Sequence, residues 1–538
     1  MTTTIRALTA LTLLAGFYLL VGLVVAATVG VDVLALQHPV AGGLKLAGLA
    51  TVAAFALLRA LLVMGKDRAE HGEHGVAVRP EDEPVLWREV ADLARWVGTA
   101  PPDEIRLVPD VNAAVSEDTR LLGLRAVRRR MYIGLPLLAT LTVSEMRSVL
   151  GHELGHYSRA HTRLGAPAYR GRVALVKAID GLGGHPLLRR VFIGYAKLYF
   201  RVSQAVSRRQ EHEADELAVR ISGRRATGSA LHKVHAAGAA WQYYLDSYVA
   251  LGGPAKATPR DLFGGFRALL AAQARRFADE AAGQQRSPYD SHPSLPERLA
   301  AIAALPEPAV APDERPAMVL LRNPAAAEHL AQQAMWTPEA RQLPSLPWEE
   351  LVARGIYVSA NAEAVTDLLV GAQRITQWRE PTLGGALAVL AHGDVERLGV
   401  ELRALGWWTR AEQPAAAGET GTAGTAGAAG TAGDGGAQTR ALVANVLTAA
   451  LQGVLVESGR ARWALSWSGP ARLVGEGGQD VDVDELAELA GRVVADPGAV
   501  AAVRAWLAGH GVPESHRPAR LPQPVTPPAT GYPAAGQR

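Results

Sequence analysis

Two long apolar stretches dominate the beginning of the chain. Residues 7–29 contain no charged residue, and residues 44–64 contain only Lys45 at the start and Arg59 near the end. Each stretch is long enough to cross the hydrocarbon core of a bilayer as a helix. A cleaved signal peptide is the alternative for the first stretch, but its apolar region is too long and a second one follows. The pattern predicts a transmembrane helical hairpin over residues 1–68.

The positive charges beside these stretches predict an orientation. Arg6 precedes the first stretch, and Lys66 and Arg68 follow the second, whereas the intervening loop has only Lys45 at its edge. Short flanks rich in Lys and Arg remain on the cytoplasmic side. We therefore expect a multi-pass protein of the cell membrane, in contact with the lipid bilayer, with the following domain in the cytoplasm.

From Asp82 onward the pattern is that of a soluble domain. The stretch "EPVLWREVADLARWVG" has apolar residues at helical spacing. The stretch "DEIRLVPD" alternates like a short strand, and "RMYIGLPLL" resembles another. Helical patterns then dominate from Ser144 to about Leu305. We predict a mainly helical α+β domain over residues 80–310.

The rest of the chain, residues 311–538, is predicted to form several smaller parts. We expect an α+β extension over 311–412 with a strand at "GIYVSA", and a disordered Gly/Ala/Thr linker over 413–438. A small α+β module over 439–512 would contain a helix, a strand pair at "RWALSWS" and "ARLV", and two further helices. The proline-rich tail 513–538 is expected to be disordered.

The composition excludes several classes of site. The 538 residues carry a net charge of +3, so no bulk electrostatic attraction to nucleic acid exists, and we predict no nucleic-acid partner. There is no cysteine. A disulfide framework, a thiolate metal site and a cysteine nucleophile are therefore excluded, and any metal must use His and carboxylate ligands.

The stretch "GHELGHYS" carries the strongest chemical signal. His152 and His156 are four residues apart, so on a helix they share a face and can hold one Zn²⁺. Glu153 is placed to take a proton from a metal-activated water. Helix context supports this, because Thr142 or Ser144 can cap the helix start. The alternative is a solvated polar turn with two incidental histidines.

A catalytic zinc site needs a third protein ligand. The stretch "SRRQEHEADELAV" offers several acidic residues, and Glu211 and Asp215 share one helix face. His212, Glu213 and Glu216 point elsewhere. A charge run of this kind is more often a solvated helix face, so spacing alone leaves the third ligand open.

Together these motifs resemble the HtpX-like and CAAX prenyl endopeptidase family of membrane zinc metallopeptidases, which are gluzincins. The resemblance covers roughly residues 1–305. It rests on the paired apolar stretches and on motifs in a fixed order, namely "PDVNAAV", "IGLPLL", "SVLGHELGH", "RRQEHEAD" and "SHPSLPERL".

The resemblance implies a gluzincin-type peptidase domain with one Zn²⁺ per chain. It makes His152 and His156 metal ligands and Glu153 the general base and acid. The glutamate of the family's second motif falls on Glu211, which becomes the third ligand. Asp215, one turn further on, would then orient a ligand histidine or brace the helix.

The resemblance also implies residues that meet the substrate. His292 would stabilise the oxyanion or bind the substrate, the alternative being a histidine that only holds its loop. Asn112 and Ala113 match an edge strand that an extended substrate can pair with. Arg298 is expected to make a structural ion pair.

One departure concerns residues 187–206. Many relatives have two further membrane spans in this part of the chain, but here Arg189, Arg190, Lys197 and Arg201 make a span unfavourable. This stretch is expected to form an amphipathic helix that lies in the membrane interface or packs against the domain.

The predicted function is that of a membrane-anchored zinc endopeptidase acting on membrane or membrane-proximal proteins and peptides. The alternative is a membrane-tethered scaffold with a vestigial metal site, whose C-terminal module recruits an unidentified protein. The intact Glu153 favours the enzyme, because a structural zinc site has no use for a base.

Overall fold

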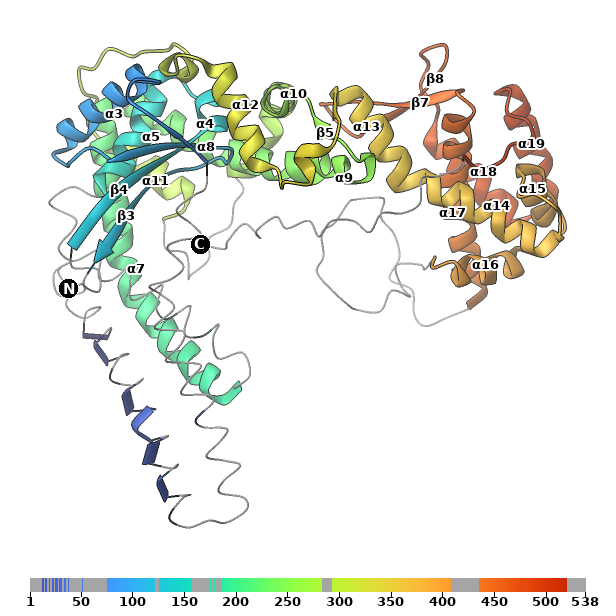
Figure 1. Ribbon diagram of the computed structural model, residues 1–538, viewed down its shortest axis with the longest axis horizontal. Coiled ribbons are helices and arrows are strands. Elements are labelled where there is room, and N and C mark those ends of the chain that lie inside the picture. The colour runs from blue at the N-terminus through green and yellow to red at the C-terminus, as the bar shows by residue number, and fades with distance from the viewer. Residues whose placement is uncertain are drawn as a thin grey trace. The chain divides into compact units, whose positions relative to one another are not determined.

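The computed structural model describes residues 75–120, 125–156, 186–282, 293–407 and 435–519, with residues 175 and 179 and scattered positions between 12 and 51. The chain divides into two units, and each is described by itself (Figure 1). The first comprises residues 1–241 and 274–335, and the second comprises residues 242–273 and 336–538.

A four-stranded sheet organises the first unit. Its strand order is β1-β2-β4-β3, with β2 parallel to β4 and the other neighbours antiparallel. The predicted strands at "DEIRLVPD" and "RMYIG" are confirmed as β2 and β4, and β3 lies at the edge. The strands are β1 Val76–Val78, β2 Glu104–Val108, β3 Ala113–Arg120 and β4 Arg125–Gly134.

Helices pack beside this sheet and supply most of the first unit. The stretch "LPLL", expected to extend a strand, forms α4 instead, because Pro136 at the helix start favours a helical turn and all four residues are buried there. The elements are α3 Pro84–Val97, α4 Leu135–Thr140, α5 Val143–Gly155, α7 Pro186–Ser222, α11 Leu295–Ala304, the 3₁₀ helix η2 Ala317–Leu320 and α12 Pro324–Met335. Helices α8 Arg224–Ser247 and α10 Leu262–Ala282 each have residues in both units.

Helix α5 begins at a capping box. The Thr142 side chain accepts a hydrogen bond from the backbone N–H of Glu145, and the Glu145 carboxylate accepts one from the backbone N–H of Thr142. Glu145 is buried and also accepts from Ser229 Oγ at 2.6 Å and from Lys233 Nζ at 2.8 Å, both on α8. These contacts fix the start of the helix that carries the two histidines.

Two glycines allow α5 and α7 to cross closely. A Cβ atom added at Gly151 would lie 2.4 Å from Cδ1 of Ile221, and one added at Gly155 would lie 3.2 Å from Cδ1 of Leu217. Both glycines directly precede a histidine, so the close crossing and the two rings are set by the same turns of α5. The sequence "GHELGH" therefore encodes packing as well as chemistry.

Helix α7 includes the whole stretch for which an amphipathic helix was expected. Phe192, Ala196 and Tyr199 recur at helical spacing and are buried, whereas Arg189 and Lys197 are exposed. This pattern confirms an amphipathic helix, with one apolar stripe packed against the protein.

The predicted membrane hairpin falls mainly outside the described residues. The described positions between 12 and 37 are helical, and Tyr195 Oη of α7 donates to the carbonyl oxygen of Leu13 at 2.5 Å. Within the described part of the chain, one helix, Gly435–Glu457, is long and apolar enough to cross a membrane. Since 61% of its most apolar window is buried in the second unit, it is accounted for as a core helix.

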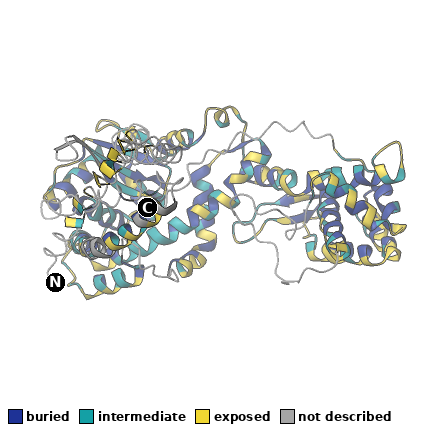
Figure 2. Ribbon diagram, turned by 90° about the horizontal axis from the view of Figure 1, so that it is seen from below, coloured by how far each residue is buried: buried dark blue, intermediate teal, exposed yellow. Residues whose placement is uncertain are grey.

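The second unit is mainly helical, and its buried residues lie on the inward faces of its helices (Figure 2). The elements are α9 Gly252–Ala255, β5 Thr258–Pro259, β6 Ser345–Leu346, α13 Trp348–Ile356, the π-helical turn η4 Tyr357–Asn361, α14 Ala362–Thr376, α15 Leu383–Ala391, α16 Val395–Ala404, α17 Gly435–Glu457, β7 Ala461–Ala464, β8 Arg472–Gly475, α18 Val483–Ala495 and α19 Val500–Gly509.

The strand expected at "GIYVSA" is absent, and these residues are helical. They end α13 and form the π-helical turn, whose last residue, Asn361, is fully buried. Its amide donates to the carbonyl oxygen of Ala449 and to Gln452 Oε1, and accepts from Trp463 Nε1 at 2.8 Å. These buried hydrogen bonds, made to residues far along the chain, favour the helical form over the local strand preference.

The predicted parts 311–412 and 439–512 are not separate, because they share one hydrophobic core. Leu368 and Leu387 pack in the same cluster as Leu447 and Val493. The first part is itself divided, since residues 311–335 group with the first unit.

The predicted domain 80–310 is also interrupted, because residues 242–273 belong to the second unit. Tyr244 lies with its ring centroid 5.5 Å from that of Trp348 and 5.7 Å from that of Phe266, and Tyr248 lies 4.9 Å from Trp467. Aromatic packing within the second unit accounts for this division.

The start of the proline-rich tail, residues 513–519, is anchored rather than disordered. The buried carboxylate of Glu457 contacts His516 Nε2 at 2.7 Å and accepts from the backbone N–H of Ala519 and from Tyr357 Oη. Burial and this carboxylate raise the pKa of Tyr357 well above its usual range.

Candidate metal centre

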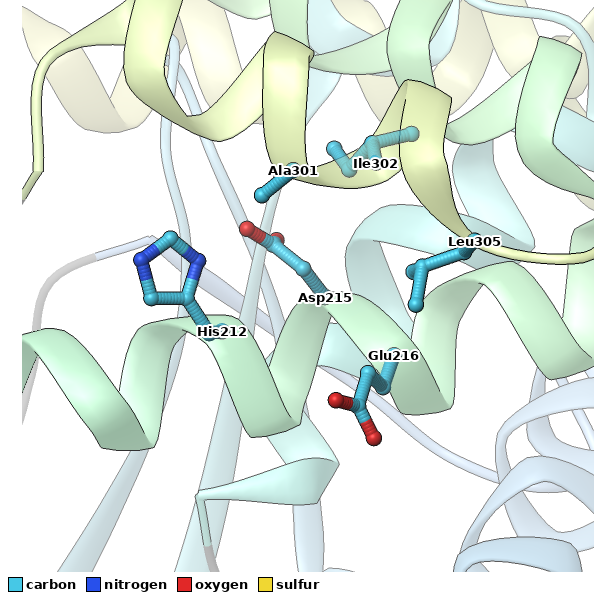
Figure 3. Close-up of a pocket in the computed structure, with 6 residues that line it drawn as sticks. All are labelled: His212, Asp215, Glu216, Ala301, Ile302 and Leu305. Carbon is cyan, nitrogen blue, oxygen red and sulfur yellow. The ribbon is translucent and has the colours of Figure 1, made fainter.

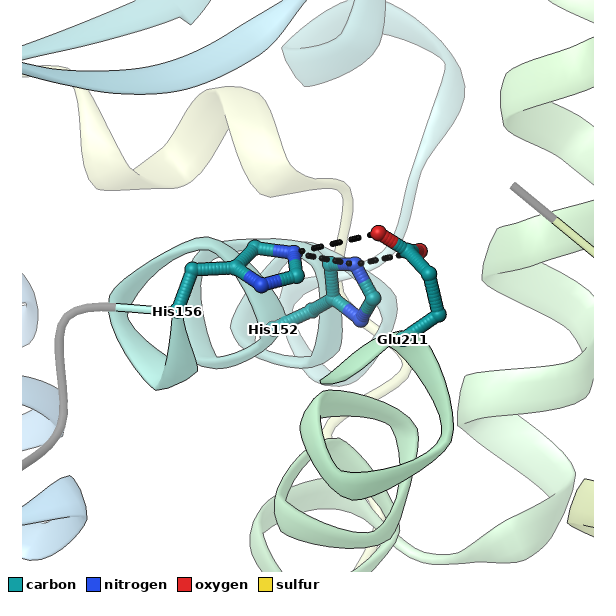
Figure 4. Close-up of side chains that lie close together, drawn as sticks. All are labelled: His152, His156 and Glu211. Atoms are coloured by element: carbon teal, nitrogen blue, oxygen red, sulfur yellow. Dashed lines mark hydrogen bonds and ion pairs between the residues drawn. The ribbon is translucent and has the colours of Figure 1, made fainter. Parts of the chain in front are cut away.

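Two helices bring three possible metal ligands together. Figure 4 shows the rings of His152 on α5 and of His156, which directly follows α5, directed at the carboxylate of Glu211 on α7. The Nε2 atoms of the two histidines are 3.2 Å apart, and they lie 3.5 and 3.6 Å from the Glu211 oxygens. Glu211 is buried although it belongs to a highly charged stretch.

The ligand spacing fits a small divalent cation. One atom from each of the three residues lies within 4.8 Å of the others. A tetrahedral ion with ligands at about 2.0–2.1 Å requires neighbouring ligand atoms about 3.4 Å apart, close to the separations found here. Two imidazole nitrogens and one carboxylate form the donor set of a catalytic zinc site, so the residues fit Zn²⁺.

Asp215 orients the first of these histidines. Its Oδ1 lies 3.1 Å from Nδ1 of His152, and the carboxylate is buried. A hydrogen bond from Nδ1 fixes the imidazole ring and leaves Nε2 directed at Glu211. Asp215 and Glu211 occupy the same side of α7 one turn apart, as their spacing predicts.

The charges around His152 shift two pKa values. Burial of the ring lowers the pKa of His152, but hydrogen bonds to Asp215 and Glu211 outweigh this effect and raise it to about 9. Burial raises the pKa of Asp215, whereas hydrogen bonds from His152 and Arg298 lower it, and the net direction is downward. Without a metal, the site therefore favours a protonated His152 beside the ionised carboxylate of Asp215.

Arg298 of α11 reaches the same cluster. It donates from Nε and Nη2 to the two oxygens of Asp215, at 2.9 and 2.6 Å. Its Nη1 lies 3.5 Å from Glu211 Oε2, and its Nη2 lies 3.4 Å from His152 Nδ1. The sequence predicted only a structural ion pair for this residue. No pattern along the chain indicates that its partners are the candidate ligand Glu211 and Asp215, which contacts the candidate ligand His152.

Glu153 lies next to His152 on α5 and is half-buried, as a residue that meets both the site and a substrate would be. Glu213, by contrast, pairs with Arg209 on its own helix at 2.6 Å, and a third of its side chain is exposed. Glu211 and Glu213 are thus distinguished by the helix face they occupy.

A pocket of about 260 Å³ lies beside the cluster, between α7 and α11. His212 and Asp215 point from α7 towards α11 there (Figure 3). The remaining lining residues are Glu216, Ala301, Ile302 and Leu305. Asp215 thus lines this pocket and also contacts His152.

Of the three residues predicted to bind the substrate, the structure describes Asn112 and Ala113. Asn112 directly precedes the edge strand β3, and Ala113 is its first residue, paired with Ile133 of β4. Helix α5 packs against β3, so the edge strand and the motif helix are neighbours. His292 lies outside the described residues.

Comparison with known proteins covers the same region. Residues 84–305 match the family model described as peptidase family M48. No curated protein and no solved structure matches the chain. The matched range contains the two histidines, Glu153, Glu211, Asp215 and Arg298. The match supports the M48 family for residues 84–305, as the resemblance to the HtpX-like and CAAX prenyl endopeptidases predicted.

Proposed function

We propose that the protein is a membrane-anchored, zinc-dependent endopeptidase. The match to family M48 implies metallopeptidase activity. The observation that carries the finer proposal is the convergence of His152, His156 and Glu211 on one point, with Glu153 on the same turn of α5. This combination suits peptide-bond hydrolysis better than a purely structural metal site.

His152, His156 and Glu211 would hold the ion. When bound, Zn²⁺ supplies Lewis acidity and leaves a fourth coordination position for water. Asp215 accepts a hydrogen bond from Nδ1–H of His152, so the proton stays on Nδ1 and Nε2 is free of a proton to bind the ion. The carboxylate of Glu153 takes a proton from the attacking water and later gives it to the leaving amine.

The proposed substrates are membrane or membrane-proximal proteins and peptides. An extended chain would pair with the edge strand at Asn112 and Ala113, because an edge strand has unpaired backbone donors and acceptors. His292 would hydrogen-bond the substrate or the developing oxyanion. The apolar stretches before residue 68 would hold the peptidase domain at the cytoplasmic face of the cell membrane.

The test combines metal analysis with a base-deficient variant. Purified full-length protein should contain one zinc per chain and cleave casein. Glu153→Gln should keep the zinc and lose activity by about 10²–10⁴-fold, the usual contribution of a general base. Glu213→Gln is the matched control, because it changes a glutamate that pairs with Arg209 outside the ligand cluster.

Two outcomes would contradict the proposal: wild-type protein without stoichiometric zinc, or Glu153→Gln cleaving casein as fast as wild type. In membranes, Glu153→Gln should also retain bound substrate. Identification of only soluble, non-membrane proteins in such a trap would overturn the proposed substrate class.

A further inference from the structure

Arg298 connects three helices at the candidate metal centre. It lies on the first turns of α11, while its partners lie on α5 and α7. Only 11% of its side chain is exposed, so its charge is compensated by these partners rather than by water. A buried guanidinium in this position needs an explanation beyond general stability.

The contacts have a definite geometry. The Nε and Nη2 groups of the guanidinium donate hydrogen bonds to the two oxygens of Asp215, and one of these oxygens, Oδ1, also lies 3.1 Å from His152 Nδ1. Asp215 therefore cannot rotate away from His152 without breaking this bidentate pair. The third nitrogen, Nη1, faces Glu211 Oε2 at 3.5 Å. A planar fork can hold a carboxylate in one orientation, whereas an ammonium group cannot.

The position of α11 is itself fixed. Ser294 and Glu297 form a capping box at its start, and the backbone N–H of Arg298 donates to the carbonyl oxygen of Ser294. Leu295 and Ile302 bury one side of the helix. The guanidinium therefore extends from a well-anchored turn and is not a mobile surface side chain.

The charges balance around a divalent ion. Glu153, Glu211 and Asp215 supply three negative charges, and Arg298 supplies one positive charge. A divalent cation bound by two neutral imidazoles and Glu211 makes the group neutral. Because Arg298→Lys keeps the positive charge, this substitution tests the geometry of the hydrogen bonds separately from the net charge of the group.

We propose that Arg298 is a positioning residue of the metal centre, which fixes His152 through Asp215 and sets the direction of the Glu211 carboxylate. This inference rests on the proposed function, in that the ion is taken to be zinc. It assigns Arg298 to the metal site instead of to a structural ion pair alone.

The test uses the full chain and measures the metal rather than activity. Zinc affinity is determined by competition with a chelator, and the absorption spectrum of the Co²⁺-substituted protein reports the ligand geometry. Arg298→Lys should weaken zinc binding about 10-fold or more, within the range for residues that orient ligands, and should change the Co²⁺ spectrum.

Arg224→Lys is the matched control. Arg224 contacts the other end of α11, donating to the carbonyl oxygens of Ala303 and Leu305 and pairing with Glu307, away from the ligands. It should leave zinc affinity and the Co²⁺ spectrum unchanged. If Arg298 had a purely structural role, Arg298→Lys would lower the thermal stability and leave the zinc affinity and the Co²⁺ spectrum unchanged.

The outcomes separate this inference from the proposed function. If wild type binds no zinc, the proposed function fails first. If wild type binds zinc and Arg298→Lys, folded by circular dichroism, has the same affinity and the same Co²⁺ spectrum, the positioning role alone is refuted. Should Arg298→Lys fail to fold, Asp215→Asn removes the charge that the fork holds, and unaltered metal binding in that variant would equally overturn the inference.

Discussion

Nδ1 of His152 and Oδ1 of Asp215 lie 3.1 Å apart, although the two residues are on different helices and far apart in the sequence. The contact exists because Gly151 and Gly155 let α7 approach α5 closely. A candidate metal ligand on one helix is thereby oriented by a residue of the other, and the helix crossing becomes part of the candidate site.

Replacing Asp215 should therefore weaken metal binding. In Asp215→Ala the His152 ring loses its orienting acceptor, and we expect zinc affinity to fall by about 10–100-fold. Chelator competition measures it. Glu216→Ala on the same helix is the control, because that side chain is 46% exposed and lies 3.7 Å from Arg220. Equal affinities in the two variants would show that Asp215 does not orient the ligand.

The two neighbouring glutamates on α7 should differ in metal content. Glu211→Ala removes a carboxylate beside both histidines, so the protein should purify with little or no zinc. Glu213→Ala breaks the pair with Arg209 and should keep one zinc per chain. Elemental analysis decides the matter, and a zinc-free Glu213→Ala would mean that the third ligand has been misassigned.

The metal-free protein should lose stability at alkaline pH. The pKa of His152 is raised to about 9 from 6.5, so its contribution is fully present below pH 6.5 and is lost as the pH rises through about 9. Urea unfolding with a chelator, at pH 6.5 and pH 9.5, measures this. His152→Gln should remove most of the difference. A metal-free wild type equally stable at both pH values would contradict the assignment.

Gly134 should tolerate no side chain. A Cβ atom there would lie 2.1 Å from the carbonyl oxygen of Asp110 and 2.7 Å from that of Asn112, which are backbone atoms that cannot move aside easily. We expect Gly134→Ala to cost about 1–3 kcal/mol in the free energy of unfolding. Gly238→Ala, in α8 with nothing within 4 Å, should instead stabilise by up to about 1 kcal/mol. Denaturant unfolding of both variants checks the difference in sign.

The shared core of the second unit makes a further prediction. Leu447 on α17 is fully buried in the core cluster that also contains residues of α14 and α16, so Leu447→Ala should cost about 2–5 kcal/mol. The amides of residues 364–402 should then exchange hydrogen faster. Val400→Ala, 61% exposed on α16, should leave that exchange nearly unchanged. If Leu447→Ala accelerated hydrogen exchange only within residues 439–512, the result would instead support two independent domains.

The candidate metal ligands were easier to predict from the sequence than the residues that hold them in position. Helical spacing placed His152 and His156 on one face, and motif resemblance selected Glu211 over Glu213. Arg298 could not be assigned, because its role depends on where α11 packs. Neither the helical form of "GIYVSA" nor the core shared across residues 413–438 follows from local preference. Both depend on partners such as Gln452 and Trp463, distant along the chain.

Helix α7 extends without interruption from Pro186 to Ser222. Tyr195, which contacts Leu13, and Glu211, which faces the histidines, are 16 residues apart, which is about 24 Å along the axis and about 160° around it. One face of this helix thus meets the N-terminal apolar stretch at Leu13, while the nearly opposite face carries the candidate ligand Glu211. Because Tyr195 and Glu211 lie on one continuous helix, a displacement of α7 at Leu13 would also move the Glu211 carboxylate relative to the two histidines.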